Sequence, residues 1–407
     1  MSTHREQERE RTAAPPAAWR MLALGVAAQA IGTLLVSTPA YLIPHLHLER
    51  GMPLAEAGLL AAAPTFGMVL TLVAWGALAD RVGERWVIAG GLALTGLFAL
   101  AAAPAGELGV LAVLLGLGGA ASASANAASG RVVVGWFPRE RRGLAMGIRQ
   151  MSQPLGVALA ALVVPPLADA AGTAGPLLLA AVLALLVAVA CAIGIQDPPR
   201  PAPRESAAPS PTPRRLGPYR RDAFLLRIHL VSALLVVPQF TLATFGLVWL
   251  IAELGWHPAA AGVVVALSQF VGALGRIGVG WLSDRVGSRI RVLRWVALAG
   301  IAAMLALAAA GALAWSAAAA ILLVAAVTVS VADNGLAFTS VAEAAGRDWS
   351  GRALGVQNTG QFLAASAVGP GMGAAIAVLG YPLAFALVAL APLLALPLIP
   401  AADRHAD

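Results

Sequence analysis

Lysine is absent from this sequence of 407 residues, so all 27 of its Lys and Arg positions are arginines. Charged residues are scarce at 12%, aromatic residues make up 6%, and the one cysteine, Cys191, excludes an intrachain disulfide. The sequence has no metal-ligand spacing, no glycine-rich nucleotide loop and no nucleophile–base set. We therefore expect neither an enzyme nor a metal or cofactor site.

Hydrophobic residues make up 59% of the sequence, and its mean hydropathy is +0.81. A membrane helix needs about 20 apolar residues, and such stretches recur along nearly the whole chain. The net charge of +7 does not indicate a nucleic-acid partner, because the arginines fall in short loops between apolar segments. The composition predicts an all-α membrane protein in a lipid bilayer.

Apolar runs between charged or Pro/Gly breaks predict twelve transmembrane helices. The expected spans are 20–44, 54–78, 86–104, 108–135, 143–168, 175–196, 225–252, 258–282, 292–314, 316–340, 352–378 and 381–400. The expected segments are an N-terminal tail, 1–19, six spans in 20–196, a Pro- and Arg-rich linker, 197–222, six more spans in 223–401, and a C-terminal tail, 402–407.

The arginines predict the orientation of these spans. If the N-terminus lies inside, every arginine except Arg50 and three intramembrane residues falls in a cytoplasmic segment. We therefore expect a multi-pass protein of the cytoplasmic (inner) membrane, with both termini in the cytoplasm.

The two halves also resemble each other in sequence. Residues 76–85 (GALADRVGER) match residues 280–289 (GWLSDRVGSR) at an offset of 204. Asn126 and Asn334 correspond at an offset of 208, as do the glycine-rich starts of the fifth and eleventh spans. Parallel repeats of this kind are typical of transporters.

The Gly-x-Leu-x-Asp-Arg-x-Gly-x-Arg pattern after spans two and eight resembles the signature loop of the major facilitator superfamily. This resemblance implies two pseudo-symmetric six-helix bundles, alternating access and a monomer. Glycines in such a loop permit a tight turn and close helix approach. The residues implied as a conformational latch are Gly76, Asp80, Arg81, Gly83, Gly280, Asp284, Arg285 and Gly287. The alternative is that the loop arginines only set topology.

Three arginines, Arg131, Arg149 and Arg276, lie inside apolar stretches, where an arginine costs roughly 2.5–3.5 kcal/mol and usually faces a polar cavity. Arg276, four residues before Gly280, resembles the carboxylate-binding arginine of oxalate/formate antiporters and monocarboxylate transporters. Its planar fork suits a carboxylate. The alternative for Arg276 and for Arg131 is a side chain that snorkels toward the interface.

Polar residues on the same and repeat-related spans complete the expected site. The first span carries a stripe of polar residues spaced four apart, and Arg149 has the repeat-mate Gln357 on span eleven. The expected substrate-binding residues are Arg276, Arg149, Gln153, Gln357, Gln361, Gln29, Tyr41, Asn126 and Asn334.

Asp333 is the clearest intramembrane acid. Such a carboxylate often couples transport to protons, so we assign it as the coupling residue; a permanent counter-ion to an arginine is the alternative. The sequence departs from the resembled families in two respects. Oxalate-type exchangers have a lysine on span eleven, and monocarboxylate transporters have an acid where this chain has Gly272.

These features predict a secondary active transporter of a small organic anion, a mono- or dicarboxylate, moved with a proton or in exchange for another anion. The alternative is a proton-coupled drug exporter of the same superfamily. Drug exporters commonly carry an acid in span one and a glycine/proline motif in span five. Here span one has no acid, and the similar Gly369–Pro370 lies on span eleven. A non-transporting membrane sensor is a third, weaker alternative.

Overall fold

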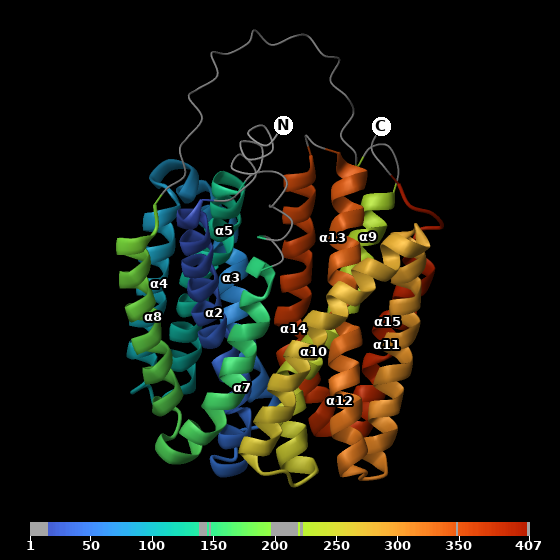
Figure 1. Cartoon of the computed structure of the whole chain (residues 1–407). Coiled ribbons are helices and arrows are strands. Elements are labelled where there is room, and N and C mark those ends of the chain that lie inside the picture. The colour runs from blue at the N-terminus through green and yellow to red at the C-terminus, as the bar shows by residue number, and fades with distance from the viewer. Residues whose placement is uncertain are drawn as a thin grey trace, which may run out of the picture. The chain divides into compact units, whose positions relative to one another are not determined.

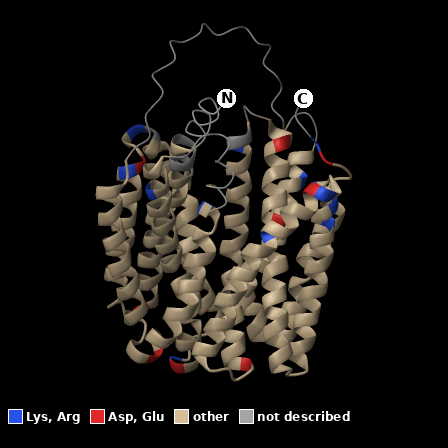
Figure 2. Ribbon diagram, in the orientation of Figure 1, with Lys and Arg blue, Asp and Glu red and all other residues tan. Residues whose placement is uncertain are grey.

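The protein is built of helices and their connections throughout the part that the structure, a computed structural model, describes (Figure 1). That part comprises residues 15–137, 145, 148–196, 219, 223–346 and 349–404, and the side chains of residues 80, 130–135, 350 and 351 are not described. Eleven of its helices are long and apolar enough to cross a membrane. Figure 2 shows most charged residues near the helix ends, as expected for spans whose middles contact lipid.

In the first half, five helices agree with the predicted spans within about four residues. The helices of this half are α2 (Pro16–Pro44, continued by η1, His45–Glu49), α3 (Leu54–Val82), α4 (Glu84–Ala102), α5 (Leu108–Trp136), α7 (Ser152–Ala171) and α8 (Ala174–Gly194). The fifth span, expected at 143–168, is observed as α7 from Ser152, and residues 143, 144, 146 and 147 of the expected start lie outside the described residues. Helix α4 packs against both α5 and α8. Small residues mediate these contacts: a Cβ on Gly91 of α4 would collide with the side chain of Ser124 on α5.

The second half repeats this arrangement. Its helices are α9 (Phe224–Val248, continued by η4, Trp249–Glu253), α10 (Pro258–Val286), α11 (Arg289–Ala312), α12 (Ser316–Ser330), α13 (Asp333–Ala345), α14 (Ser350–Val388), α15 (Leu390–Ala395) and η5 (Leu396–Leu398). Helix α9 packs against α12, α13, α14 and α15, and α11 packs against α10, α12, α13, α14 and α15.

The last membrane segment, Arg352–Leu398, is 47 residues long, about 70 Å as a single helix and too long for a hydrocarbon core of about 30 Å. The segment is not a single helix, because Gly380, with φ 72° and ψ 168°, breaks it inside α14. The segment is therefore two consecutive crossings, and the prediction of twelve transmembrane helices is confirmed.

One predicted span differs from a single helix. The span expected at 316–340 is divided into α12 and α13, with a turn at Val331 and Ala332 between them, and it extends to Ala345. Neither turn residue is proline or glycine, the usual causes of a break. Asp333 is the first residue of α13 and follows the break directly.

By its internal contacts the chain divides into two compact units that only partly follow the two halves. Unit 1 comprises Met1–Thr38, Ala63–Ala160 and Ala170–Glu205, and unit 2 comprises Pro39–Ala62, Ala161–Asp169 and Ser206–Asp407.

Close backbone contacts explain why short stretches of α3 and α7 join unit 2. A Cβ on Gly58 would lie 2.1 Å from the carbonyl oxygen of Gly369, and one on Gly262 would lie 2.3 Å from that of Ala161. Gly58 and Gly262 are repeat-mates at an offset of 204, and Ala161 and Gly369 at 208. The two contacts are therefore equivalent under the internal repeat.

Candidate functional site

A polar cluster in unit 1 joins α2, α5 and the residues just before α7. Arg149 Nη1 donates to Gln29 Oε1 at 3.2 Å and to Ser129 Oγ at 3.1 Å. Ser129 also donates to Gln29 Oε1 at 3.2 Å, and Gln29 Nε2 donates to Asn126 Oδ1 at 3.4 Å. Gln29 and Ser129 are buried. The structure thus brings three of the predicted residues together around one guanidinium.

The other predicted residues of the first half lie outside this cluster. Gln153 has no hydrogen bond within the described residues. Tyr41 is buried in unit 2, and no described group bonds its hydroxyl. The side chain of Arg131 lies outside the described residues. Ser129 was missed in the sequence, although its place three residues after Asn126, on one helix face, was the available signal.

A longer polar network runs through unit 2. Asn334 Nδ2 donates to Gln239 Oε1 at 3.0 Å, and Gln361 Nε2 donates to Asn334 Oδ1 at 3.1 Å. Ser232 Oγ accepts from Gln361 Nε2 at 2.6 Å and from Gln357 Nε2 at 3.0 Å. The network joins α9, α13 and α14, and three of its five members were predicted.

His229 and Tyr219 extend this network to the start of α9. His229 Nδ1 lies 2.7 Å from Gln357 Oε1, and Tyr219 Oη lies 2.9 Å from His229 Nε2. Because Gln357 uses its Nε2 as the donor to Ser232, its Oε1 accepts, so His229 carries a proton on Nδ1. A neutral ring then accepts at Nε2 from Tyr219, whose partial burial raises the pKa of its phenol.

Arg276 and Asp333 are charged residues that the sequence places well inside apolar spans of the second half, away from the span ends. Arg276 Nε donates at 3.2 Å to the carbonyl of Val331, in the turn between α12 and α13. The terminal nitrogens of Arg276 have no hydrogen bond within the described residues. The broken helix thus supplies one acceptor and leaves the fork of the guanidinium available.

Asp333 is only 1% exposed, and no described side chain donates a hydrogen bond to its carboxylate. Its charge interacts with that of Arg276 and with the backbone N–H groups of Asp333 and Asn334, although the acid and the arginine form no direct ion pair among the described residues. A buried carboxylate with so few partners is costly unless a nearby positive charge compensates it.

The two signature loops make the predicted turns with left-handed glycines, Gly83 (φ 98°) and Gly287 (φ 67°). Arg81 is exposed, and the side chain of Asp80 is not described. A Cβ on Gly280 would meet no heavy atom of the described residues within 4 Å. The close helix approach expected at Gly76 and Gly280 stays a prediction.

The loops differ in their ionic contacts. Arg85 Nε donates to the carbonyl of Ala192 at 2.6 Å. Its repeat-mate Arg289 instead binds Glu343 of α13 at 2.8 Å and approaches Asp284 at 3.5 Å. Arg285 stacks over Trp281, with 3.9 Å between the guanidinium carbon and the ring centroid. The second loop is thus tied to its neighbours by charge, whereas the Arg85 contact shown in the first loop is to a backbone carbonyl.

Comparison with known proteins agrees with this architecture. The chain is 48% identical over 384 residues to an uncharacterized MFS-type transporter of Mycobacterium tuberculosis, covering 94% of this chain and 85% of that protein. It is 25% identical over 313 residues, 70% of each chain, to a 4-hydroxybenzoate transporter of Pseudomonas putida.

The fold resembles the crystal structure of a bacterial homolog of the human lysosomal transporter Spinster, in an inward-facing and occupied conformation. The TM-score is 0.79 at 15% sequence identity, covering 95% of this chain and 97% of that one. Residues 21–369 match the family model of the Major Facilitator Superfamily. The chain therefore belongs to the Major Facilitator Superfamily and is a multi-pass membrane transporter.

Proposed function

We propose that the chain is a secondary active transporter of a small organic anion, a mono- or dicarboxylate, and that Arg276 binds the substrate carboxylate. The observation that carries this proposal is the arrangement of the Arg276 guanidinium. Its Nε is fixed by the Val331 carbonyl, while its terminal nitrogens have no hydrogen bond within the described residues. Two parallel N–H groups on a positioned guanidinium match the two oxygens of a carboxylate.

Asp333 gives this site a means of coupling to protons. When a substrate carboxylate pairs with Arg276, Asp333 loses its compensating charge inside the protein. A buried carboxylate in that position is relieved by binding a proton. Substrate anion and proton therefore enter together, and the site remains electrically balanced in both its empty and its loaded form. The transport mode that follows is proton symport.

Arg149 supports the same substrate class from unit 1. Its Nη1 donates to two neutral side chains, Gln29 and Ser129, and an arginine inside a membrane span usually faces a polar cavity or an opposite charge. The relative named as a 4-hydroxybenzoate transporter points to a carboxylate as well. We infer that Gln29, Asn126 and Ser129 position Arg149 rather than select the substrate.

The membrane orientation is part of the proposal. The arginine distribution supports a cytoplasmic membrane protein with both termini in the cytoplasm. On this basis the two signature loops lie on the cytoplasmic side, where they act as the conformational latch. In the second loop, the Arg289–Glu343 ion pair joins the latch to α13.

A thermal-shift screen of the purified protein tests the substrate class. The panel holds benzoate, 4-hydroxybenzoate, short dicarboxylates, the neutral amides of the same acids, and lipophilic cations. A ligand that binds only the native state raises the melting temperature of the protein. At a ligand concentration of 100 times Kd, the added free energy of stabilisation is about 2.7 kcal/mol. We expect stabilisation by at least one carboxylate and none by its amide. Stabilisation by the cations alone would instead support a drug exporter.

A further inference from the structure

The C-terminal segment after η5 is fixed to unit 2 through its backbone carbonyls. Arg227 on α9 donates from Nε to the carbonyl of Leu398 at 2.8 Å and from Nη2 to that of Pro397 at 3.0 Å. Arg294 on α11 donates from Nη2 to the carbonyl of Pro400 at 3.2 Å. Carbonyls at a helix end lack helical partners, so these arginines satisfy acceptors that would otherwise need water.

Asp403, at the other end of this segment, caps α11. Its Oδ1 accepts from the backbone N–H of Arg289 at 2.9 Å and from that of Ile290 at 3.1 Å. Ser288 Oγ accepts from the N–H of Arg291 at 3.2 Å, and the Ser288 carbonyl accepts from that of Val292 at 3.4 Å. The N–H groups of Arg289, Ile290 and Arg291, three of the four that a helix start leaves without intrahelical partners, are therefore satisfied, and the Val292 bond is the first of the helix itself.

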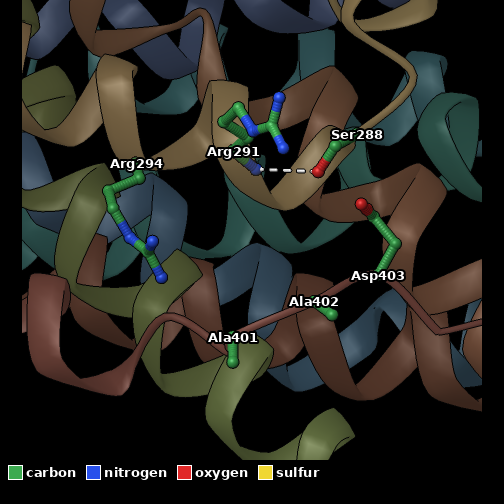
Figure 3. Close-up of a pocket in the computed structure, with 6 residues that line it drawn as sticks. All are labelled: Ser288, Arg291, Arg294, Ala401, Ala402 and Asp403. Atoms are coloured by element: carbon green, nitrogen blue, oxygen red, sulfur yellow. Dashed lines mark hydrogen bonds between the residues drawn. The ribbon is translucent and has the colours of Figure 1, made fainter.

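A cavity of about 400 Å³ lies between the segment and the start of α11. Figure 3 shows the residues that line it, with Asp403 reaching toward Ser288. It is lined by Ser288, Arg291, Arg294, Ala401, Ala402 and Asp403. Ala401 and Ala402 are exposed, whereas Ile399 before them is buried in a core cluster that includes Ile290 and Leu293 of α11. The segment therefore holds α11 by apolar packing at one end and by the Asp403 cap at the other.

The capped residue Arg289 is also the residue that joins the second signature loop to α13. Its side chain binds both carboxylate oxygens of Glu343, with Nε 3.0 Å from Oε2 and Nη2 2.8 Å from Oε1. Glu343 lies near the end of the helix that begins with Asp333. Asp403 thus fixes the backbone of Arg289, and the Arg289 side chain fixes the far end of the helix that carries the proposed coupling residue.

The first repeat has no equivalent arrangement. Helix α4, which corresponds to α11, follows Gly83, and no side chain accepts a hydrogen bond there as an N-cap. Arg85, the repeat-mate of Arg289, donates to the Ala192 carbonyl at the end of α8. Among the described residues, the cap supplied by a distant carboxylate is shown for the second repeat.

We propose that residues 397–403 form a strap, and that Asp403 is a positioning residue of the conformational latch. By capping α11 it holds Arg289 against Glu343 and Asp284, and so sets how readily α13 and the second loop rearrange during transport. It acts without contacting substrate. This inference rests on membership of the transporter family and not on the proposed anion.

Hydrogen–deuterium exchange of the full-length protein tests the cap without any substrate. Loss of an N-cap costs about 0.5–2 kcal/mol, so Asp403→Ala should speed local exchange about 2- to 30-fold in peptides covering 286–294 and 335–346. Asp403→Asn should restore slow exchange, because asparagine caps as well as aspartate. Arg291→Gln, which lines the same cavity without touching the strap through its side chain, is the matched control.

Three outcomes would overturn the proposal. One is unchanged exchange in Asp403→Ala. Another is equally fast exchange in Asp403→Asn, which would make charge rather than capping responsible. The third is acceleration that extends equally to the first-loop peptide 78–90, which would indicate general destabilisation.

A transport measurement then separates positioning from binding. In proteoliposomes loaded with 4-hydroxybenzoate, Asp403→Ala should lower the exchange rate of the labelled acid several-fold while its Kd stays within about twofold of the parent. A proportional change in Kd would overturn a positioning role. If the parent protein does not transport this acid, the substrate proposal fails for 4-hydroxybenzoate. The hydrogen–deuterium exchange experiment still tests whether Asp403 caps α11.

Discussion

The two halves of the chain share a polar framework but distribute charge differently within it. In each half an asparagine of the fourth span bonds a glutamine of the first: Asn126 with Gln29, and Asn334 with Gln239. The fifth span of each half then adds a polar side chain that reaches the first span. In the first half that residue is Arg149, and in the second it is Gln357.

The difference lies in what surrounds these shared positions. The first half centres its cluster on the Arg149 guanidinium. The second half fills the equivalent position with amides and a histidine, and moves its charge to Arg276 on α10 and Asp333 at the helix break. A duplicated framework therefore preserves helix–helix bonding, whereas the charges that differ between the copies are the candidates for substrate binding and coupling.

We expect the largest effect on transport and stability from removing the charge of Arg276, alone or together with that of Asp333. Arg276→Gln should abolish carboxylate transport and destabilise the protein. Asp333 must then bind a proton or stay charged without its compensating charge, which costs up to about 3–5 kcal/mol. Arg276→Gln combined with Asp333→Asn should recover the melting temperature but not the transport. Transport by the double variant would show that the pair is structural only.

Arg149→Gln makes the first half resemble the second. The fold should remain, because glutamine can still bond Gln29 and Ser129. A hydrogen bond from a charged group to the substrate carboxylate contributes about 1.5–3 kcal/mol. Its loss should therefore raise the Kd of the carboxylate about 10- to 150-fold. Isothermal titration measures it, with Gln357→Asn as the matched control in the other half. Equal losses in the two variants would contradict an asymmetric role.

Asp333→Asn should separate binding from proton coupling. The variant should still exchange labelled carboxylate across a proteoliposome membrane, because Arg276 is retained. It should no longer accumulate the acid against its gradient, whereas a parent that moves one proton per anion reaches up to about tenfold accumulation per pH unit. Accumulation that persists in this variant would leave Asp333 as a counter-ion.

The smallest effects are expected at the shared asparagines. Interhelical polar bonds in membrane proteins average about 0.6 kcal/mol, or about threefold in an equilibrium constant. Asn126→Ala and Asn334→Ala should therefore lower stability by similar small amounts in a denaturation series. A much larger loss for Asn334 would indicate that its side chain serves the site beside Asp333 as well as the framework.

Much of the fold follows from the sequence, because long apolar runs and loop arginines report on the membrane directly. The division of the tenth span was not predictable: Val331 and Ala332 are ordinary apolar residues, and the turn depends on packing and on the Arg276 hydrogen bond to Val331. Gly380, by contrast, marks the break between the last two spans with a residue suited to positive φ.

The candidate site was predictable where polar residues repeat and not where they are single. Arg149, Asn126 and Asn334 were found through the internal repeat, and Gln29 through its helical stripe. Ser129, Ser232 and His229 have no repeat-mate that signals a contact. Arg227, Arg294 and Arg276 donate to backbone carbonyls. Every residue has such a carbonyl, so the sequence does not indicate which ones accept.

Uptake of labelled 4-hydroxybenzoate and short dicarboxylates into proteoliposomes tests the central claim most directly, with the parent protein, Arg276→Lys and Arg276→Gln compared in parallel. Lysine keeps the charge but loses the planar fork. The account predicts saturable carboxylate uptake by the parent, a marked reduction in Arg276→Lys and none above empty liposomes in Arg276→Gln. Equal carboxylate uptake by all three proteins would contradict it.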